Sequence, residues 1–363
     1  MRLRDPDMPT PAEQLTGRFL DGGWKVLSRF QRPPGATGGC FSQGYVVQSP
    51  HGRKAYLKAL DYHRGFTPGV DPAMVLAAMT TAFNHERDLC VRCQKRSLSH
   101  VVEIITDGHV WIDPTDPFSV VQYLIFEHAA GDMRASMDAG ATLDLAWGLR
   151  VLHNVAVGLQ ELHGLDIVHQ DLKPSNVLTF SRVESKIADL GHAATRSTPS
   201  PLEGSDIAAD PAYAPLEQCY RFRQPDDYRH RLAGDMYLLG SLTAFIFTKV
   251  GMTALLVSHL NDNFHWRRWG GTYTDVLPYL KVAFAAVLTV CNKAMPVTCA
   301  DELTRILSYL CEPDPLLRGD PSDRVGHRNP YTLERFISRF DRMAKRAECR
   351  LMDSQHVSIY RRS

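Results

Sequence analysis

The sequence predicts an α+β fold in which a small antiparallel β-rich part precedes a larger, mostly α-helical part. Before Glu127, short apolar runs alternate with breaks such as Pro33-Pro34-Gly35 and Gly38-Gly39, a pattern typical of an antiparallel β-meander. After Glu127, apolar residues recur at every third or fourth position, which is the spacing of one face of an α-helix. We therefore expect the boundary between the two parts near residues 127–131.

The first part should contain one main helix among its strands. Residues 1–23 carry scattered prolines and aspartates and are expected to form an irregular N-terminal extension. A polar linker over residues 61–71 leads to Pro72, which is expected to open a helix that ends near Lys95, since proline is tolerated in the first helical turn. Strands are expected over residues 25–30, 44–48, 54–60, 101–106, 110–112 and 119–126.

The second part is predicted to be helical. One helix face is marked by Leu145, Leu149, Leu152, Ala156, Leu159 and Leu162. Another apolar helix is expected over residues 235–250, followed over residues 251–300 by helical segments without a readable motif. Apolar residues return at helical spacing over 333–351, between basic positions. We expect a docking helix with a solvated basic face, and a basic C-terminal tail over 346–363.

Composition narrows the partners and the compartment. The chain has 363 residues with 41 Lys and Arg against 40 Asp and Glu, so no global positive field favours nucleic acid. Its apolar runs stay shorter than the roughly 20 residues that a membrane span needs, and no span is expected. The eight scattered cysteines favour reduced thiols and a cytoplasmic location. Cys90 and Cys93 lack a second pair at zinc-site spacing, so two thiols one helical turn apart are expected there.

One stretch carries the chemistry. The residues His169-Gln170-Asp171-Leu172-Lys173-Pro174-Ser175-Asn176 are followed by Asp189-Leu190-Gly191. This pattern resembles the catalytic loop and the metal loop of the eukaryotic-like serine/threonine protein kinases. The resemblance implies a bilobal fold with ATP in the cleft: an N-lobe over 24–127 and a C-lobe over 128–345, the latter including the unassigned helical region 251–300.

The residue types fit the chemistry that the resemblance implies. Phosphoryl transfer requires positioning and neutralisation of charge, with little covalent work by the protein. The resemblance assigns Asp171 to orient and accept from the attacking hydroxyl, and Lys173 to lie near the transferring phosphate. It assigns Asn176 and Asp189 to hold Mg²⁺, with Mn²⁺ as a substitute, because these cations prefer oxygen ligands.

Further positions match the nucleotide-binding part of the family. Lys58, in the third strand-like run, matches the lysine that contacts the α- and β-phosphates. Glu86 follows 28 residues later in the predicted helix and is the best candidate for its ion-pair partner. The hinge is expected at residues 126–129, where adenine would bond to backbone groups near Glu127 and Ala129, with Phe126 at the rear of the pocket.

Structural positions of the family are matched as well. The resemblance pairs Glu217 with Arg318 in a structural salt bridge. It also implies that Asp235 anchors the catalytic loop from below and that His169 supports the same loop. This set distinguishes protein kinases from small-molecule phosphotransferases, which typically lack the activation-segment architecture.

The nucleotide-binding positions depart from the family pattern in two places. Only Gly39 falls on an expected glycine of the phosphate-covering loop, which would hold phosphate less tightly than a loop with all its glycines. Tyr56 stands where the family usually has a small alanine against adenine. Strand alternation places Tyr56 on the same face as Lys58, so its ring either crowds adenine or swings aside and stacks on it.

Two departures concern the activation segment. Gln170 replaces the arginine that normally pairs with a phosphorylated activation loop, so residues 191–210 are expected to order without phosphorylation. Asp210 stands where the family usually has a threonine that ties the catalytic aspartate to Lys173. An aspartate there either accepts from Lys173 or repels Asp171, and the sequence leaves both open.

The sequence thus predicts an ATP-dependent kinase that phosphorylates Ser and Thr hydroxyls of proteins, itself included. One alternative is a pseudokinase, a nucleotide- or protein-binding scaffold with weak or no catalysis. A small-molecule kinase is the third reading. The protein substrates are not identified by the sequence, and a regulatory protein partner is a further expectation, since no sensor domain is recognised.

Overall fold

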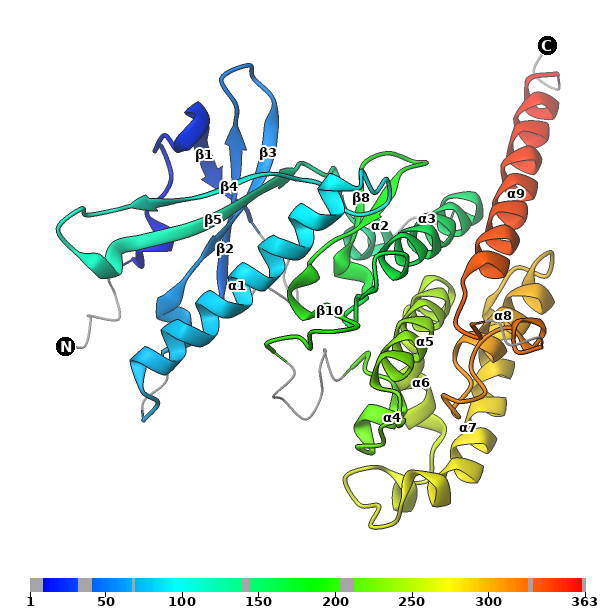
Figure 1. The fold of residues 1–363 in the computed structure, drawn as a ribbon. Helices are drawn as coiled ribbons and strands as arrows, with labels where there is room; N and C mark the ends of the chain where they lie inside the picture. Colours follow the sequence, from blue (N-terminus) through cyan, green and yellow to red (C-terminus); the bar gives the residue numbers. More distant parts are fainter. Residues whose placement is uncertain are drawn as a thin grey trace. The chain divides into compact units, whose positions relative to one another are not determined.

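The computed structural model describes residues 9–31, 41–66, 69–138, 144–202, 212–325 and 329–360, the last ten of these by their backbone alone. The chain divides into two compact units, Met1–Ala130 and Gly131–Ser363. Figure 1 shows strands in the first unit and mostly helices in the second. The expected fold class is confirmed: an antiparallel β-sheet part is followed by a mostly helical part.

An antiparallel sheet forms the body of the first unit. Its order is β1-β2-β3-β5-β4. The strands are β1 (Lys25–Arg29), β2 (Ser42–Gln48), β3 (Lys54–Leu60), β4 (Ile104–Trp111) and β5 (Val120–Glu127). Alternation divides the side chains of β3 between two faces, because Ala55, Leu57 and Ala59 are fully buried in the core whereas Tyr56 and Lys58 are partly exposed.

The two strands expected over 101–106 and 110–112 form a single strand, β4. The gap between the two expected strands covers residues 107–109, which include Gly108. In the structure, a Cβ at Gly108 would lie 2.5 Å from the hydroxyl oxygen of Tyr123 on β5. The tyrosine ring therefore covers the bare backbone of the glycine, and the strand continues through it, as aromatic residues do beside strand glycines elsewhere.

Residues 9–24 are more closely attached to the first unit than an irregular extension would be. They contain two 3₁₀ turns, Pro11–Glu13 and Asp21–Gly23. Ala12, Leu15 and Leu20 are buried in the same cluster as the core residues of β2 and β3. The Tyr45 hydroxyl donates a hydrogen bond of 2.6 Å to the Ala12 carbonyl oxygen. The described part of the segment thus completes one side of the sheet core.

Helix α1 (Pro72–Lys95) has the expected bounds. The Asp71 side chain accepts a 2.9 Å hydrogen bond from the Ala73 amide and so caps the helix. The buried residues recur along one face and include Phe83, Glu86 and Leu89. Glu86 is thereby carried on the face of the helix that is turned into the unit.

The second unit contains the helices α2 (Met133–Asp138), α3 (Leu145–His163), α4 (Leu216–Cys219), α5 (Asp227–Thr248), α6 (Met252–His259), α7 (Tyr273–Ala294), α8 (Ala300–Leu310) and α9 (Glu334–Tyr360). Helix α5 is buried on all sides from Tyr228 to Ile246, except at Arg229, and α3 packs along α9. Short strands complete the unit: β6 (Gly131–Asp132), β7 (Ile167–Val168), β8 (Val177–Thr179), β9 (Ser185–Ile187) and β10 (Ala194–Thr195). Strand β10 pairs with β7, and β8 lies between β6 and β9.

Two helices exceed their expected bounds. Helix α5 begins at Asp227, before the expected residue 235, because Asp226 caps it by accepting from the Arg229 amide. Its first two turns are polar in sequence and were therefore not recognised as helical. Helix α9 continues through the expected tail boundary at 345, since the buried positions continue to Ala347.

Helix α7 is long and apolar enough to cross a membrane by length and composition alone. The same helix contributes Val276, Leu280 and Val287 to the buried core of the second unit. A core helix passes that test too, so the observation is weak evidence for a span.

Candidate active site

The loop between β7 and β8 gathers three of the predicted site residues around one carboxylate. The Lys173 ammonium donates to Asp171 Oδ2 at 2.8 Å. The Asn176 side-chain nitrogen donates to the same oxygen at 3.1 Å and to the Asp171 carbonyl at 2.8 Å. All three side chains are almost completely buried. The Asp171 carboxylate is thus held in one orientation by two donors.

Asp235, on α5, holds this loop from its other side. Its carboxylate accepts from the amides of His169 and Gln170, both at 2.8 Å. His163, at the end of α3, contacts the same carboxylate at 2.9 Å. Asp235 is fully buried, and a buried carboxylate is stabilised by such charge-assisted hydrogen bonds. The loop backbone is therefore fixed by a side chain more than 60 residues distant.

His169 contributes through both ring nitrogens. Its Nδ1 accepts from the Asp171 amide at 3.2 Å, and its Nε2 lies 3.0 Å from the Ala188 carbonyl oxygen. Since a carbonyl oxygen can only accept, the network assigns the ring proton to Nε2. The imidazole connects the catalytic loop to the residue that precedes Asp189.

Asp189 follows β9 in a left-handed backbone conformation, with φ 65° and ψ 77°. Gln170 also has a positive φ, 64°. Such conformations are uncommon outside glycine and persist where the surrounding contacts determine them. Gln170 is buried, and its side-chain nitrogen donates to the His192 carbonyl at 2.8 Å. The side chain of Gln170 thus fastens the segment after Asp189 to the catalytic loop.

The donor set of this unit suits a hard divalent cation. The Asn176 side-chain nitrogen is directed at two oxygens of Asp171, which turns the amide oxygen, Oδ1, away from Asp171. Asn176 Oδ1 and the Asp189 carboxylate are oxygen ligands of the kind that Mg²⁺ takes, together with substrate phosphates. No cluster of three or more His, Cys, Asp or Glu at metal spacing occurs among the described residues. A cation shared with a phosphate ligand does not require such a cluster.

In the first unit, Lys58 and Glu86 form a bidentate ion pair. Lys58 Nζ lies 2.7 Å from Glu86 Oε1 and 2.9 Å from Oε2. The glutamate is buried and the lysine is about one-fifth exposed. Glu86 therefore fixes the orientation of the Lys58 ammonium on the partly exposed face of β3.

The residues of the expected hinge lie on or after β5. Phe126 pairs with Tyr56 across the β3–β5 ladder and is nearly buried. Glu127 is held through both its backbone and its side chain: its amide donates to the Glu103 carbonyl, and its Oε1 accepts from the Glu103 amide. Ala129 follows the strand outside regular structure.

Glu217 and Arg318 form a fully buried, bidentate salt bridge with N–O distances of 2.6 and 3.0 Å. The guanidinium also donates to the carbonyls of Ala233 and Glu312. Burial lowers the pKa of Arg318, but the Glu217 carboxylate more than offsets this, and the pKa lies above its ordinary value. The pair joins α4 to the segment after α8.

Two predicted residues, Gly39 and Asp210, lie outside the described residues. Two histidines at the site were missed by the sequence analysis. His163 contacts Asp235, and His192 Nδ1 lies 3.8 Å from Asp171 Oδ2. The position of His192 directly after Asp189-Leu190-Gly191 was the available signal, whereas His163 looked like the end of an apolar helix.

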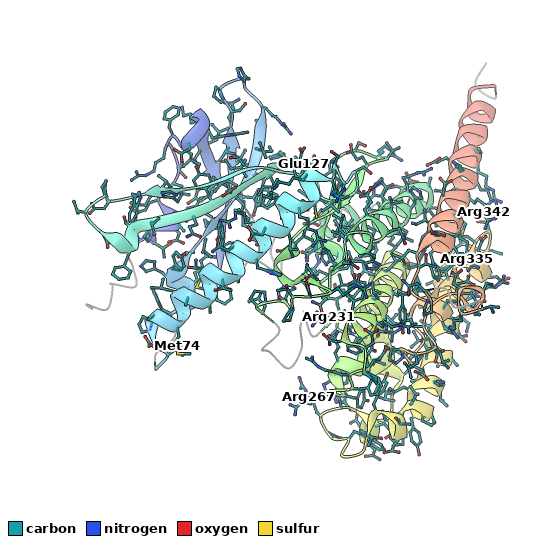
Figure 2. All side chains as sticks on the ribbon, viewed as in Figure 1. Met74, Glu127, Arg231, Arg267, Arg335 and Arg342 are labelled. Carbon is teal, nitrogen blue, oxygen red and sulfur yellow. The ribbon has the colours of Figure 1, made fainter. Side chains whose placement is uncertain are left out.

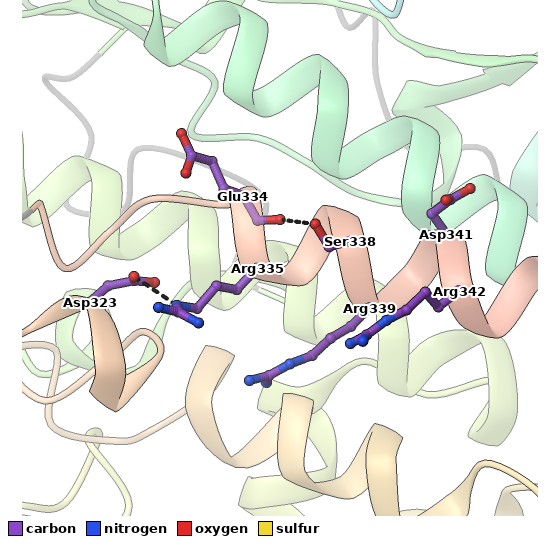
Figure 3. A pocket seen from close by; sticks show the side chains of 7 residues that line it. All are labelled: Asp323, Glu334, Arg335, Ser338, Arg339, Asp341 and Arg342. Carbon is purple, nitrogen blue, oxygen red and sulfur yellow. Dashed lines mark hydrogen bonds and ion pairs between the residues drawn. The ribbon is translucent and has the colours of Figure 1, made fainter.

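A surface pocket of about 560 Å³ lies on α9, apart from all of these residues (Figure 3). Arg335 and Arg342 on this helix are labelled in Figure 2. Arg335 donates to Asp323 at 2.8 Å and Arg339 to Asp320 at 2.5 Å. Asp341 is paired with Arg150 and Lys345, so four of the six charged side chains that line the pocket are engaged in ion pairs, which is typical of a structural surface network.

Parts of the chain are similar to known proteins. A model of the protein kinase domain matches residues 77–327. The chain is similar to mitogen-activated protein kinase 13 of Oryza sativa subsp. indica, with 26% identity over 214 residues, 56% of this chain and 40% of that protein. It is also similar to mitogen-activated protein kinase 17 of Arabidopsis thaliana, with 25% identity over 209 residues, 56% of this chain and 42% of the relative. The chain therefore spans less than half the length of these relatives.

Proposed function

Because the chain belongs to the protein kinase family, we propose that it transfers the γ-phosphate of ATP to serine and threonine hydroxyls of protein substrates, itself included. The observation that carries this proposal is the buried Asp171 carboxylate, which accepts hydrogen bonds from Lys173 and Asn176. A lysine at position 173 favours Ser and Thr hydroxyls over tyrosine as acceptors. The relatives described as mitogen-activated protein kinases support a protein substrate.

In this mechanism the residues of the second unit act on the acceptor and on the transferring group. Asp171 accepts a hydrogen bond from the substrate hydroxyl, orients it and receives its proton. Lys173 holds Asp171 and neutralises charge on the transferring phosphoryl group. Asn176 Oδ1 and the Asp189 carboxylate hold the divalent cation, which supplies positive charge to the phosphate oxygens when bound.

In the first unit, Lys58 binds the α- and β-phosphates while Glu86 holds it in position. The ion pair of 2.7 Å supports this, since the lysine is already oriented before a ligand arrives. Backbone groups near Glu127 and Ala129 bind the adenine edge. We also propose that the chain has protein partners and a cytoplasmic location. It is proposed to bind no nucleic acid and to have no membrane span. The formal charge of +1 is consistent with it.

A phosphorylation assay tests the proposal. Purified protein incubated with Mg²⁺, labelled ATP and a basic protein such as myelin basic protein is expected to label serine and threonine. Asp189→Asn is expected to reduce the labelling at least ~100-fold, because one cation ligand loses its charge. Phosphoamino-acid analysis and the initial rate are the measurements.

The outcomes separate the three readings. No labelling in the wild type together with no nucleotide-induced rise in Tm contradicts nucleotide use altogether. A rise in Tm without labelling indicates a pseudokinase. Labelling of sugars or antibiotics without labelling of protein indicates a small-molecule kinase, which the buried Glu217–Arg318 pair disfavours.

Activity is expected to persist without phosphorylation of the activation segment. Gln170 carries no charge to pair with a phosphate, and its hydrogen bond to the His192 carbonyl already fastens the segment. Strand β10 is likewise paired with β7. Protein treated with a phosphatase, freed of that enzyme and checked by mass spectrometry should keep most of its initial rate. A loss that returns after autophosphorylation contradicts this expectation.

A further inference from the structure

Tyr56 lies on the face of β3 that carries Lys58. The alternating residues Ala55, Leu57 and Ala59 are fully buried on the other face, and side chains alternate along a strand. In the sheet, Tyr56 pairs with Val46 on β2 and with Phe126 on β5, while Lys58 pairs with Gly44. Tyr56 and the proposed phosphate-binding Lys58 are therefore neighbours on the same face of β3, two residues apart.

The ring of Tyr56 covers Gly44. A Cβ built at Gly44 would lie 2.6 Å from the hydroxyl oxygen of Tyr56, 3.0 Å from Cε2 and 3.1 Å from Cζ. Real Cβ atoms do not approach other atoms this closely, so the ring occupies the space that a side chain at position 44 would need. The ring of Phe30, just after β1, meets it edge-on at 5.4 Å between centroids and 87° between planes. Two neighbours thus hold the ring against the sheet.

The sizes of the side chains at positions 44 and 56 are reversed relative to the family pattern. In the pattern G-x-G-x-x-G-x-V, the register that places Gly39 on the second glycine places the valine at Gly44. In V-A-I-K, the small alanine corresponds to Tyr56. In this chain the large side chain is at the β3 position, Tyr56, and the β2 position, Gly44, has no side chain. The Tyr56 ring therefore occupies the space that the valine side chain would fill.

We propose that the Tyr56 ring, seated on Gly44, is the surface on which the adenine base stacks. This proposal rests on the proposed function, because it concerns the nucleotide of the same site. An aromatic ring offers a π-face to the base, and stacking of a base on an aromatic side chain is sequence-tolerant and favourable. Gly44 is then a positioning residue, because the absence of a side chain at position 44 leaves the space that the Tyr56 ring occupies. The chain then recognises adenine by stacking on Tyr56.

A double-mutant cycle tests the coupling. Affinities for adenosine and for Mg·ATP are measured by calorimetry in the wild type, Tyr56→Ala, Gly44→Val and the double variant. Tyr56→Ala is expected to weaken adenosine binding about 5- to 150-fold, the range for one base–aromatic stack. Gly44→Val is expected to weaken it as well, since the valine displaces the ring toward the base. The double variant restores the family pair and is expected to return to within about threefold of the wild type.

Conservative variants keep the test decisive if a member of the cycle does not fold. Tyr56→Phe keeps the ring and should recover most of the affinity that Tyr56→Ala loses. Gly44→Ala introduces the Cβ that meets Tyr56 at 2.6 Å and should reproduce the effect of valine in milder form. Tyr279→Ala removes a partly exposed tyrosine of α7 in the second unit and should leave affinity unchanged. Tm values establish folding for each variant.

The failures of the two proposals are distinguishable. If the wild type transfers phosphate but the losses in the cycle add, or Tyr56→Ala binds adenosine as tightly as the wild type or more tightly, the stacking proposal is overturned and the kinase proposal stands. If the wild type binds nucleotide with the predicted coupling but transfers no phosphate, stacking stands and catalysis fails. If the wild type binds neither adenosine nor ATP, both proposals are overturned.

Discussion

Asp171→Asn is expected to lower kcat for protein phosphorylation about 10²- to 10⁴-fold, the range for loss of a positioned general base. The amide has the size of the carboxylate, so the donors Lys173 and Asn176, at 2.8 and 3.1 Å in the wild type, keep an oxygen to bind. The change removes the group that accepts the substrate proton without opening a cavity. Steady-state kinetics with a protein substrate give the measurement.

The split between kcat and KM makes this prediction specific. Asp171 acts on the hydroxyl, so the KM for ATP and the nucleotide-induced rise in Tm should remain near the wild-type values. Asp166→Asn is the matched control, since that carboxylate is half-exposed and paired with Arg196 on the surface. Retention of more than about one-tenth of kcat in Asp171→Asn would show that another group receives the proton.

Arg318→Met is expected to destabilise the second unit by about 3–5 kcal/mol, the cost of leaving a buried charge without its partner. Glu217 and Arg318 are both fully buried. The variant strands the Glu217 carboxylate and deprives the carbonyls of Ala233 and Glu312 of a donor. Urea denaturation followed by far-UV circular dichroism gives the free energy of unfolding.

Two further variants show whether the loss of stability in Arg318→Met comes from burial of an unpaired charge. Arg268→Met breaks an ion pair whose two side chains are mostly exposed, and it should change stability by less than about 1 kcal/mol. Glu217→Met combined with Arg318→Met removes both charges and should be less destabilising than Arg318→Met alone. Equal losses in the single and double variants would mean that packing and carbonyl contacts, and not charge, carry the effect.

The catalytic loop was predictable because its chemistry is contiguous in the sequence. Asp171, Lys173 and Asn176 lie within six residues, so their meeting around one carboxylate requires only a tight turn. The bounds of α1 were equally accessible, since Asp71 and Pro72 mark its start and the buried face repeats at helical spacing. In both cases the determining interactions are local.

The errors arose where a distant residue changes the meaning of a local signal. The expected gap between strands at residues 107–109 was wrong, because the Tyr123 ring covers Gly108 and the strand continues. Residues 12–20 carry no regular pattern, yet the sheet core accepts three of their apolar side chains. His192 directly follows Asp189-Leu190-Gly191, but its proximity to Asp171 depends on how the segment after β9 returns to the catalytic loop.

The sequence by itself determined the fold class, the bounds of α1 and the candidate residues of the catalytic loop, because periodicity and motif spacing act over a few residues. It left two readings of Tyr56: a ring that crowds adenine, or one that swings aside and stacks on it. The tertiary structure supplied the ring's position, because that position depends on Gly44 of the neighbouring strand and on Phe30. A glycine without a side chain makes room for the tyrosine only once β2 and β3 are paired in register.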